Sequence, residues 1–340
     1  MNIILVLPLL LSFFTGLFLI PFWIKKAKEI GLLWEDMNKP EHPKTVAGSG
    51  GIGVFLSFIL GTLTYIAIKT FYFKSKDNLI EIFALLSVVL VIAFIGILDD
   101  LLGWKKGGLS IRSRLILLFF SSIPLIVINA GESTIFGINL GLLYPLIIIP
   151  LGIVGVSATF NFLAGYNGLE SSQGIIILSS MGLITFLMGE KWLSIITLCM
   201  VVSLISFYIF NKYPARVFPG NILTYSVGAL IATIAILGNI EKIALFFFIP
   251  YIIETILKSR GKLKKQSFAK VNPDGSLELP YDKIYGLEHL AILILKKIKP
   301  SHKVYETDVV HLINLFQILI IILGFILFRN ELSAVHASIF

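Results

Sequence analysis

Charged residues are scarce in this chain. Asp, Glu, Lys and Arg make up 14% of the 340 residues, whereas apolar types make up 56%. A typical soluble domain carries about 25% charged residues, so this composition excludes an ordinary soluble protein. Apolar runs of about 17–22 residues recur from end to end, and that length crosses a hydrocarbon core of ~30 Å. We therefore expect residues 1–340 to form a single all-α integral membrane domain in the cell membrane.

Several other features are absent. The only cysteine is Cys199, which excludes an internal disulfide. The five histidines are scattered and form no metal-ligand pattern. We predict no strand before "GSGGIG" (48–53), whereas a nucleotide loop would follow one. The N-terminal run lacks a basic start and a cleavage site, so we expect it to remain as a membrane span. Internal repeats typical of many transporters are not evident.

The apolar runs predict about ten membrane spans, and the basic residues test that count. With the loop after the first span placed in the cytoplasm, 22 of the 28 Lys and Arg fall on the cytoplasmic side. This bias predicts that both termini lie outside. The predicted spans are 3–24, 47–68, 80–98, 113–130, 141–158, 173–188, 191–209, 221–238, 241–257 and 309–328.

Unusual polar residues gather in the loops of the predicted cytoplasmic side. External loops are short and plain by comparison. The asymmetry predicts one cytoplasmic site built from five loops, because mere residence in a membrane requires no such difference. The five loops are "WEDMNKPEHPKTVAGSGG" (34–51), "LDDLLGWKKGGLSIRSR" (98–114), "ATFNFLAGYNGLESSQG" (158–174), "NKYPARVFPGN" (211–221) and the basic segment 258–308.

Asp99 and Asp100 are the most unusual of these polar residues. They follow a long apolar run, and carboxylates are disfavoured near the negative end of a helix dipole. Acids at a membrane edge are functional by default, although a solvated helix end is the simpler alternative. Asn161 and Asn167 supply neutral oxygen and amide groups that suit a hydrated metal or a base edge, or an ordinary turn.

The segment 258–308 is the largest piece outside the predicted spans. "FAKVNPDGSLEL" (268–279) predicts a β-hairpin around a Pro-Gly turn. "GLEHLAILILKKI" (286–298) predicts an amphipathic helix on the bilayer surface, between spans nine and ten. The lysines of this segment could anchor to anionic lipid or hold a polyphosphate, and the pattern does not decide between them.

Three classes of function compete at this point. A cation-coupled transporter would place its charges near mid-span, where this chain has almost none. A non-enzymatic membrane protein would not need five polar loops on one face. An enzyme that joins a soluble phosphorylated substrate to a lipid phosphate explains the location directly, so we favour it.

The motifs resemble those of the polyprenyl-phosphate N-acetylhexosamine-1-phosphate transferases. Within this family, the motifs of the chain are most similar to those of the UDP-N-acetylglucosamine–dolichyl-phosphate N-acetylglucosaminephosphotransferases. The resemblance implies ten spans and transfer of an N-acetylhexosamine-1-phosphate, most simply the N-acetylglucosamine form, from a UDP-sugar to a polyprenyl or dolichyl phosphate. UMP would leave, Mg²⁺ would be required, a homodimer would be compatible, and nucleic acid would not be a partner. The matching pieces are "DMNK" (36–39), "GILDDLLGW" (96–104), "NFLAGYNGLESSQG" (161–174), "VFPGN" (217–221) and "VNPDGSLELPYDKI" (271–284).

The resemblance also implies roles for individual residues. Asp99, Asp100 and Arg114 would be catalytic, with Arg114 meeting the phosphates. Asn161, Asn221 and Asp100 would face magnesium. Asn167 would bond the uracil edge, and Phe218 would stack on the uracil ring. The remaining substrate-binding residues would be Glu35, Asp36, Met37, Lys44, Lys264, Lys265 and Gln266.

Four positions depart from the family pattern. Asn221 stands where an aspartate is common, which predicts weaker metal binding. Ala158 replaces an asparagine, Ala47 replaces an acid and Gln266 replaces an arginine. The bacterial histidine-rich loop motif is also missing.

The aspartates need not act as bases in such a reaction. A phosphate monoester has a second pKa near 6, so the lipid nucleophile is already mostly dianionic at neutral pH. Bringing that dianion onto another phosphate requires positioning and cations above all. The two aspartates are therefore expected mainly to organise magnesium and basic residues, with a base role for Asp99 as the alternative.

Overall fold

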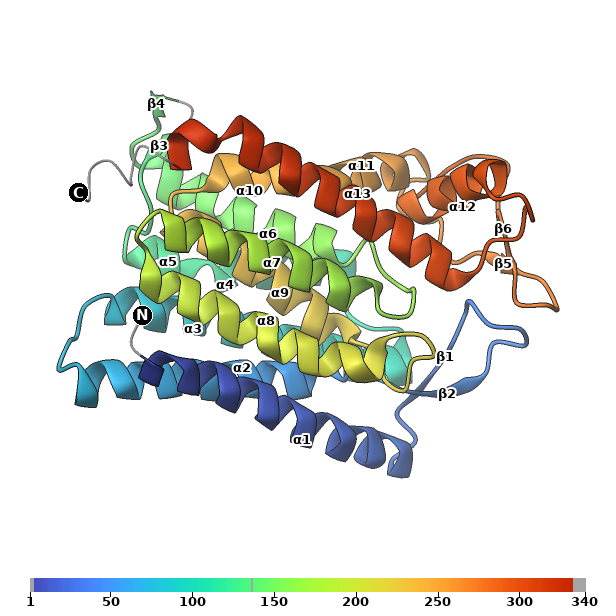
Figure 1. Ribbon diagram of the computed structural model, residues 1–340, viewed down its shortest axis with the longest axis horizontal. Coiled ribbons are helices and arrows are strands. Elements are labelled where there is room, and N and C mark those ends of the chain that lie inside the picture. Colours follow the sequence, from blue (N-terminus) through green and yellow to red (C-terminus); the bar gives the residue numbers. More distant parts are fainter. Residues whose placement is uncertain (1–2, 136, 333–340) are drawn as a thin grey trace.

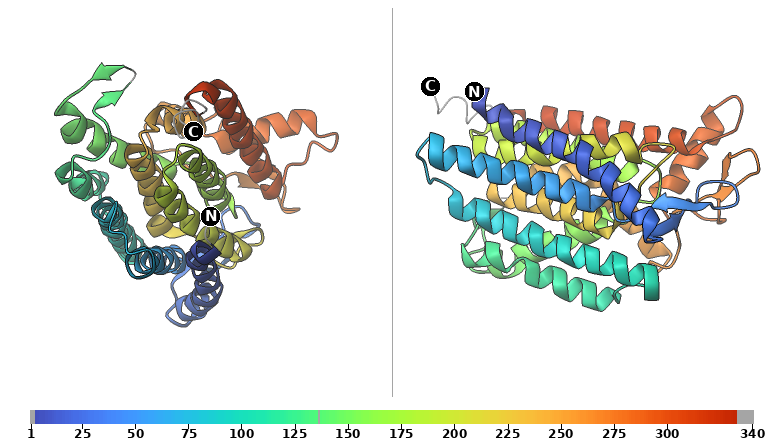
Figure 2. Two further views of the ribbon diagram at one scale, coloured as in Figure 1. Left: turned by 60° about the vertical axis from the view of Figure 1, so that its left-hand side comes forward. Right: turned by 90° about the horizontal axis from the view of Figure 1, so that it is seen from below.

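The computed structural model describes residues 3–135 and 137–332, which form a bundle of helices along one long axis (Figure 1 and Figure 2). Within these residues, seven helices are long and apolar enough to cross a membrane. This confirms the expected all-α membrane fold. The seven are α1 (Leu7–Glu29, after a 3₁₀ turn Ile3–Val6), α2 (Gly51–Ala67, continued by a π-helical turn Ile68–Tyr72), α3 (Leu79–Lys106), α7 (Leu169–Leu187), α8 (Lys191–Asn211), α9 (Gly220–Leu237) and α13 (Glu306–Leu327).

The other three predicted spans are interrupted. Residues 113–130 fall on α4 (Ile111–Ser121) and α5 (Ile123–Val127), and residues 141–158 on a π-helical turn (Tyr144–Ile148) followed by α6 (Ile149–Phe160). Residues 241–257 fall on α10 (Glu241–Phe247) and α11 (Ile249–Arg260). A proline stands in the first turn of α5, α6 and α11, where its missing N–H is tolerated, so each proline marks a restart of the helix. The count of ten spans stays a prediction.

Five of the small elements gather at one end of the bundle (Figure 1). They are β1 (Leu33–Glu35), β2 (Lys44–Ala47), the hairpin of β5 (Lys270–Val271) and β6 (Leu277–Glu278), and α12 (Leu287–Ile298). The predicted hairpin and amphipathic helix in 258–308 are therefore confirmed as elements. The short hairpin of β3 (Thr134–Ile135) and β4 (Ile138–Asn139) lies at the opposite end, as do the start of α1 and the end of α13.

Helix α9 lies inside the bundle and packs against α2, α3, α6 and α7. Nearly all its side chains are buried, which fits a helix that is apolar all round. Its start is tied to the start of α2, because Ala47 forms a parallel bridge with Val217 and Phe218 N–H donates to Ala47 C=O at 2.8 Å. The polar starts of α2 and α9 are thereby held together.

Candidate active site

Asp99 lies near the end of α3, and protein groups engage both of its carboxylate oxygens. Oδ2 lies 3.1 Å from Nε of Arg114 and accepts from the side-chain amide of Asn221 at 3.0 Å. The hydroxyl of Tyr225 donates to the same oxygen at 3.2 Å, and the N–H of Leu109 donates to Oδ1 at 2.7 Å. Asp99 is only 1% exposed. This geometry suits a residue that holds Arg114 and Asn221 in place.

Asp100 faces the start of α9 instead. Its Oδ1 accepts from the N–H of Asn221 at 2.7 Å, and its Oδ2 from the N–H of Ile222 at 3.4 Å. These are otherwise unpaired amides of a helix N-terminus, where negative charge is favoured. Gly220 has φ +71° and passes so close that a Cβ atom there would lie 2.2 Å from Asp100 Oδ2. A glycine is therefore required for the carboxylate to reach the helix.

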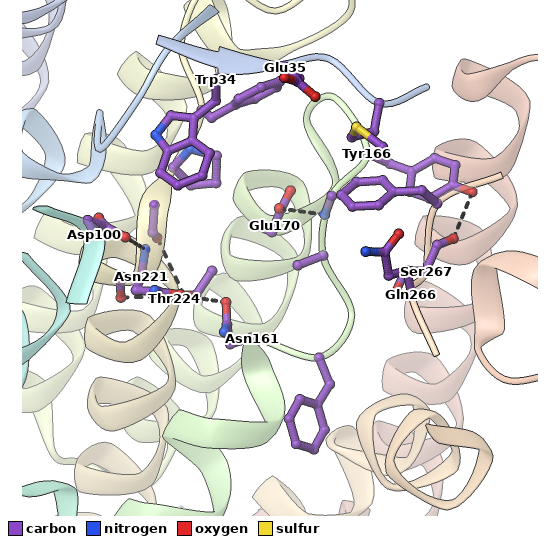
Figure 3. Close-up of a pocket in the computed structure, with 18 of the residues that line it drawn as sticks. Trp34, Glu35, Asp100, Asn161, Tyr166, Glu170, Asn221, Thr224, Gln266 and Ser267 are labelled. Atoms are coloured by element: carbon purple, nitrogen blue, oxygen red, sulfur yellow. Dashed lines mark hydrogen bonds between the residues drawn. The ribbon is translucent and has the colours of Figure 1, made fainter. Parts of the chain in front are cut away.

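A cavity of about 450 Å³ opens beside Asp100, at the end of the bundle that carries the polar loops (Figure 3). Asp100, Asn221, Thr224 and Asn161 lie on one side of it, and Tyr166, Gln266 and Ser267 lie across from them. Five separate segments thus contribute to one cavity, which agrees with the expected site made from five loops. Further lining residues include Trp34, Glu35, Met37, Ser49, Phe162, Glu170, Phe218, Lys258 and Phe268.

The residues expected at the metal supply one carboxylate and two amides. Asn161, at the end of α6, accepts from the hydroxyl of Thr224 at 2.9 Å, and Asn221 gives its amide N–H₂ to Asp99. Both amide oxygens and Asp100 are thus brought to one side of the cavity. In the described part of the chain, no group of three or more His, Cys, Asp or Glu could hold a metal by itself. Magnesium is usually bound by one or two carboxylates together with water and substrate phosphates, so this donor set fits it.

Successive side chains of the segment Glu35–Met37 point in opposite directions. Glu35 and Met37 line the cavity. Asp36 is buried on the other side, where both its carboxylate oxygens lie 3.4 Å from the amide nitrogen of Asn167. Lys44 is exposed on β2, directly across the ladder from Glu35.

Asn167 lies outside the cavity wall, in a buried polar network. Its amide N–H₂ donates to Glu306 at 2.9 Å, and its Oδ1 accepts from the N–H of Ala215 at 2.7 Å. Lys39 makes ion pairs with both Glu306 and Asp36. In this structure Asn167 therefore joins the first polar loop to α13, and its expected contact with uracil stays a prediction.

Aromatic side chains from several loops line the cavity, among them Phe218 and Trp34. Phe218 is half-buried there, and its expected stacking on uracil stays a prediction. Trp34 lies close to Gly48, where a Cβ atom would be 2.4 Å from the indole ring. Glycine at position 48 therefore makes room for the indole.

Only some of the basic and neighbouring residues expected to contact the substrate lie at the cavity. Gln266 lines the cavity, whereas Lys264 and Lys265 are exposed outside its wall. The ammonium of Lys265 lies 4.6 Å from the ring centre of Tyr281, a cation–π contact. Arg114 is engaged by Asp99 and by the carbonyl of Leu109, at 3.1 Å.

Sequence reasoning did not single out several lining residues, among them Trp34, Glu170, Thr224 and Lys258. Thr224 lies one helical turn beyond Asn221, so a shared face of α9 was a usable signal. Glu170 accepts from the N–H of Gly165 at 2.8 Å and holds the loop that follows Asn161. Lys258 carried no signal that distinguished it from the other ten basic residues of 258–308.

Comparisons with known proteins define the class. The sequence profile of glycosyl transferase family 4 matches residues 82–239, which include both aspartates, Asn161 and Asn221. Together with the identity to the relatives below, this shows that the chain belongs to glycosyl transferase family 4 and is a transferase.

Two archaeal relatives are named "Putative UDP-N-acetylglucosamine--dolichyl-phosphate N-acetylglucosaminephosphotransferase". The protein from Saccharolobus solfataricus is 38% identical over 293 residues, which is 84% of this chain and 87% of the relative. The protein from Sulfolobus acidocaldarius is 31% identical over 303 residues, 87% of this chain and 89% of the relative. A phospho-N-acetylmuramoyl-pentapeptide-transferase from Streptococcus pyogenes is 29% identical over 258 residues, 72% of this chain and 76% of the relative.

Proposed function

We propose that this protein transfers an N-acetylhexosamine-1-phosphate, most simply the N-acetylglucosamine form, from a UDP-sugar to a polyprenyl phosphate of the dolichyl type. The observation that carries this proposal is the cavity in which Asp100, Asn161 and Asn221 meet, at the end of the bundle that carries the polar loops. The names of the relatives support both substrates.

In the proposed reaction, an oxygen of the lipid phosphate attacks the β-phosphorus of the UDP-sugar. The bond from that phosphorus to the UMP oxygen breaks, and UMP leaves with the electron pair. The nucleophile is mostly dianionic at neutral pH, so no side chain has to remove a proton. Asp99, with both oxygens engaged, is suited to orienting Arg114 and Asn221.

The charge of the cavity supports a magnesium requirement, which is part of the proposal. Its described lining residues include the acids Glu35, Asp100 and Glu170, against one basic residue, Lys258. Polyanionic substrates would be repelled unless further positive charge entered with them. Magnesium, when bound by Asp100 with the amide oxygens of Asn161 and Asn221, would supply that charge to the phosphates.

An apolar groove of about 300 Å³ supports a lipid substrate. It lies between α6, α9 and α10, and its wall is almost wholly apolar. Helix α6 lines both spaces, with Val156 in the groove and Asn161 in the cavity. A prenyl chain in the groove would have its phosphate directed along α6 toward Asp100.

We propose further that the cavity faces the cytoplasm and that both termini lie outside. The distribution of Lys and Arg supports this orientation. The homodimer that is compatible with the family resemblance stays a prediction.

The direct test uses the purified full chain with UDP-N-acetylglucosamine, Mg²⁺ and either dolichyl or undecaprenyl phosphate. We expect UMP release that depends on the lipid phosphate and stops when the free metal is chelated. Failure to release UMP with any of several UDP-N-acetylhexosamines would overturn the proposal. Activity without added metal would overturn only its magnesium part.

A further inference from the structure

Lys258 is the only basic residue among the described residues that line the cavity. None of the cations expected from sequence, Arg114, Lys44, Lys264 and Lys265, is among these lining residues. Arg114 is paired with Asp99, and Lys265 lies over the ring of Tyr281. A site that accepts phosphates therefore has a single side-chain ammonium in its wall, and no motif pointed to it.

Lys258 is held in place by the buried residue Glu254. The two lie one turn apart on α11, and Nζ of Lys258 is 3.5 Å from Oε1 of Glu254. The other oxygen of Glu254 accepts from the N–H of Leu287, at the start of α12, at 2.6 Å. Glu254 is 0% exposed, so its carboxylate is fixed by α12 on one side and faces Lys258 on the other.

The ion pair leaves Lys258 able to bind a further anion. A separation of 3.5 Å is longer than a normal N–H···O hydrogen bond, and an ammonium has three N–H donors. The lysine side chain is 14% exposed, and its ammonium lies 5.7 Å from the ring centre of Phe162, which also lines the cavity. The side chain is therefore largely enclosed, and Lys258 forms part of the cavity wall beside Phe162.

A second buried acid does not cancel this charge. Glu288 is 0% exposed, and neither of its carboxylate oxygens has a hydrogen-bond partner. Burial, with the neighbouring Glu254, raises the pKa of Glu288 well above its ordinary value. The raised pKa favours the uncharged form of Glu288, so this acid opposes the charge of Lys258 less than an ordinary carboxylate would.

We propose that Lys258 is a substrate-contacting residue that binds a phosphate group in the cavity, and that Glu254 is a positioning residue that aims it. This inference rests on the proposed function. The phosphate belongs either to the nucleotide sugar or to the lipid, and both present the same oxyanion to the lysine.

The test measures binding as well as turnover, with full-length protein in detergent and Mg²⁺. UDP-N-acetylglucosamine, undecaprenyl phosphate and undecaprenol, which lacks the phosphate, are titrated separately against wild type, Lys258→Gln and Lys258→Arg. The matched control is Arg260→Gln, which removes an exposed charge two residues further along α11.

We expect Lys258→Gln to weaken one phosphate ligand at least tenfold and to raise its KM in parallel. Binding of undecaprenol should not change, Lys258→Arg should retain most of the affinity, and Arg260→Gln should stay within twofold of wild type throughout. The weakened ligand identifies the source of the phosphate. If Lys258→Gln does not fold, Lys258→Met provides the same comparison.

The positioning role of Glu254 has its own readout. We expect Glu254→Gln to weaken the same ligand as Lys258→Gln but not the other one. The double variant should be no weaker than Lys258→Gln alone, because the effect of Glu254 passes through Lys258. Equal weakening of both ligands by Glu254→Gln would show a general structural role and overturn this part.

The inference and the proposed function fail separately. Normal UMP release together with unchanged binding of both phosphate ligands by Lys258→Gln overturns the role of Lys258 alone. A wild type that binds a phosphate ligand through Lys258 but releases no UMP overturns the proposed function alone. A wild type that binds neither phosphate ligand overturns both.

Discussion

At the scale of single residues, Asp100 and Asp99 have different surroundings although they are adjacent in sequence. Asp99 is enclosed by Arg114, Asn221 and Tyr225, whereas Asp100 lines the cavity. We therefore expect Asp100, rather than Asp99, to meet a cation that is bound with the substrate.

Replacing Asp100 by asparagine should reduce turnover about a hundredfold or more, because it removes the cavity's carboxylate beside Asn221. The amide oxygen of the variant can keep the short bond from the N–H of Asn221 and loses only the 3.4 Å contact with Ile222, so thermal unfolding should change little. UMP release and an unfolding curve for Asp100→Asn, compared with the exposed control Asp77→Asn, measure both effects. Near-normal turnover with saturating Mg²⁺ would contradict the role given to Asp100.

Asn221→Asp tests the departure from the family pattern. The amide of Asn221 donates to Asp99 at 3.0 Å, so an aspartate would lose that bond and bring two carboxylates together. We expect the variant to need less Mg²⁺ for half-maximal activity, and to unfold at a lower temperature than wild type when Mg²⁺ is chelated. An Mg²⁺ requirement equal to or above that of wild type would show that this position does not face the metal.

At the scale of elements, local sequence signals were sufficient to predict the elements whose contacts are local. The hairpin β5–β6 and the amphipathic helix α12 follow from a Pro-Gly turn and a helical apolar period. The prolines of α5, α6 and α11 also mark interruptions that an apolar-run count cannot detect.

Contacts between segments that are distant in the chain could not be predicted from local sequence signals. The ladder of β1 and β2 joins Leu33 to Ala47, and Ala47 then meets Val217. Which basic residue of 258–308 reaches the cavity likewise depends on how α11 and α12 meet at Glu254. These contacts are set by tertiary packing, which no local pattern in one sequence records.

The start of α12 predicts a pH dependence of stability. Burial raises the pKa of Glu288 well above its ordinary value, so the folded protein keeps a proton that the unfolded chain releases. The stabilising effect is complete below the ordinary carboxyl pKa and is lost as pH rises toward the folded value. We expect the unfolding temperature of Glu288→Gln to fall less than that of wild type between about pH 5 and pH 8.

The control for that experiment is Asp282→Asn, an exposed acid in the same segment. Its unfolding temperature should follow wild type across the pH range. Parallel curves for wild type and Glu288→Gln would mean that Glu288 is not held protonated in the folded protein.

At the scale of the whole molecule, the polar elements lie at one end and the chain's two described ends at the other (Figure 1). The single cysteine, Cys199, is fully buried, so introduced cysteines can report the orientation without background. In sealed cells we expect a membrane-impermeant thiol reagent to label Lys76→Cys but not Ser301→Cys, two exposed positions at opposite ends. After permeabilisation both should react; the reverse pattern would invert the proposed topology.

The tie between the starts of α2 and α9 constrains how this chain can vary in length. Ala47 and Gly50 exchange backbone hydrogen bonds with Phe218, and Gly51 N–H donates to Pro219 C=O at 2.9 Å. One residue inserted there would shift the register of both helix starts and displace the carboxylate of Asp100 from its amides. The exposed turn at 40–43 bears no such ladder, so we expect insertions to be tolerated there. The connection between Ala47 and Phe218, in contrast, has a fixed length.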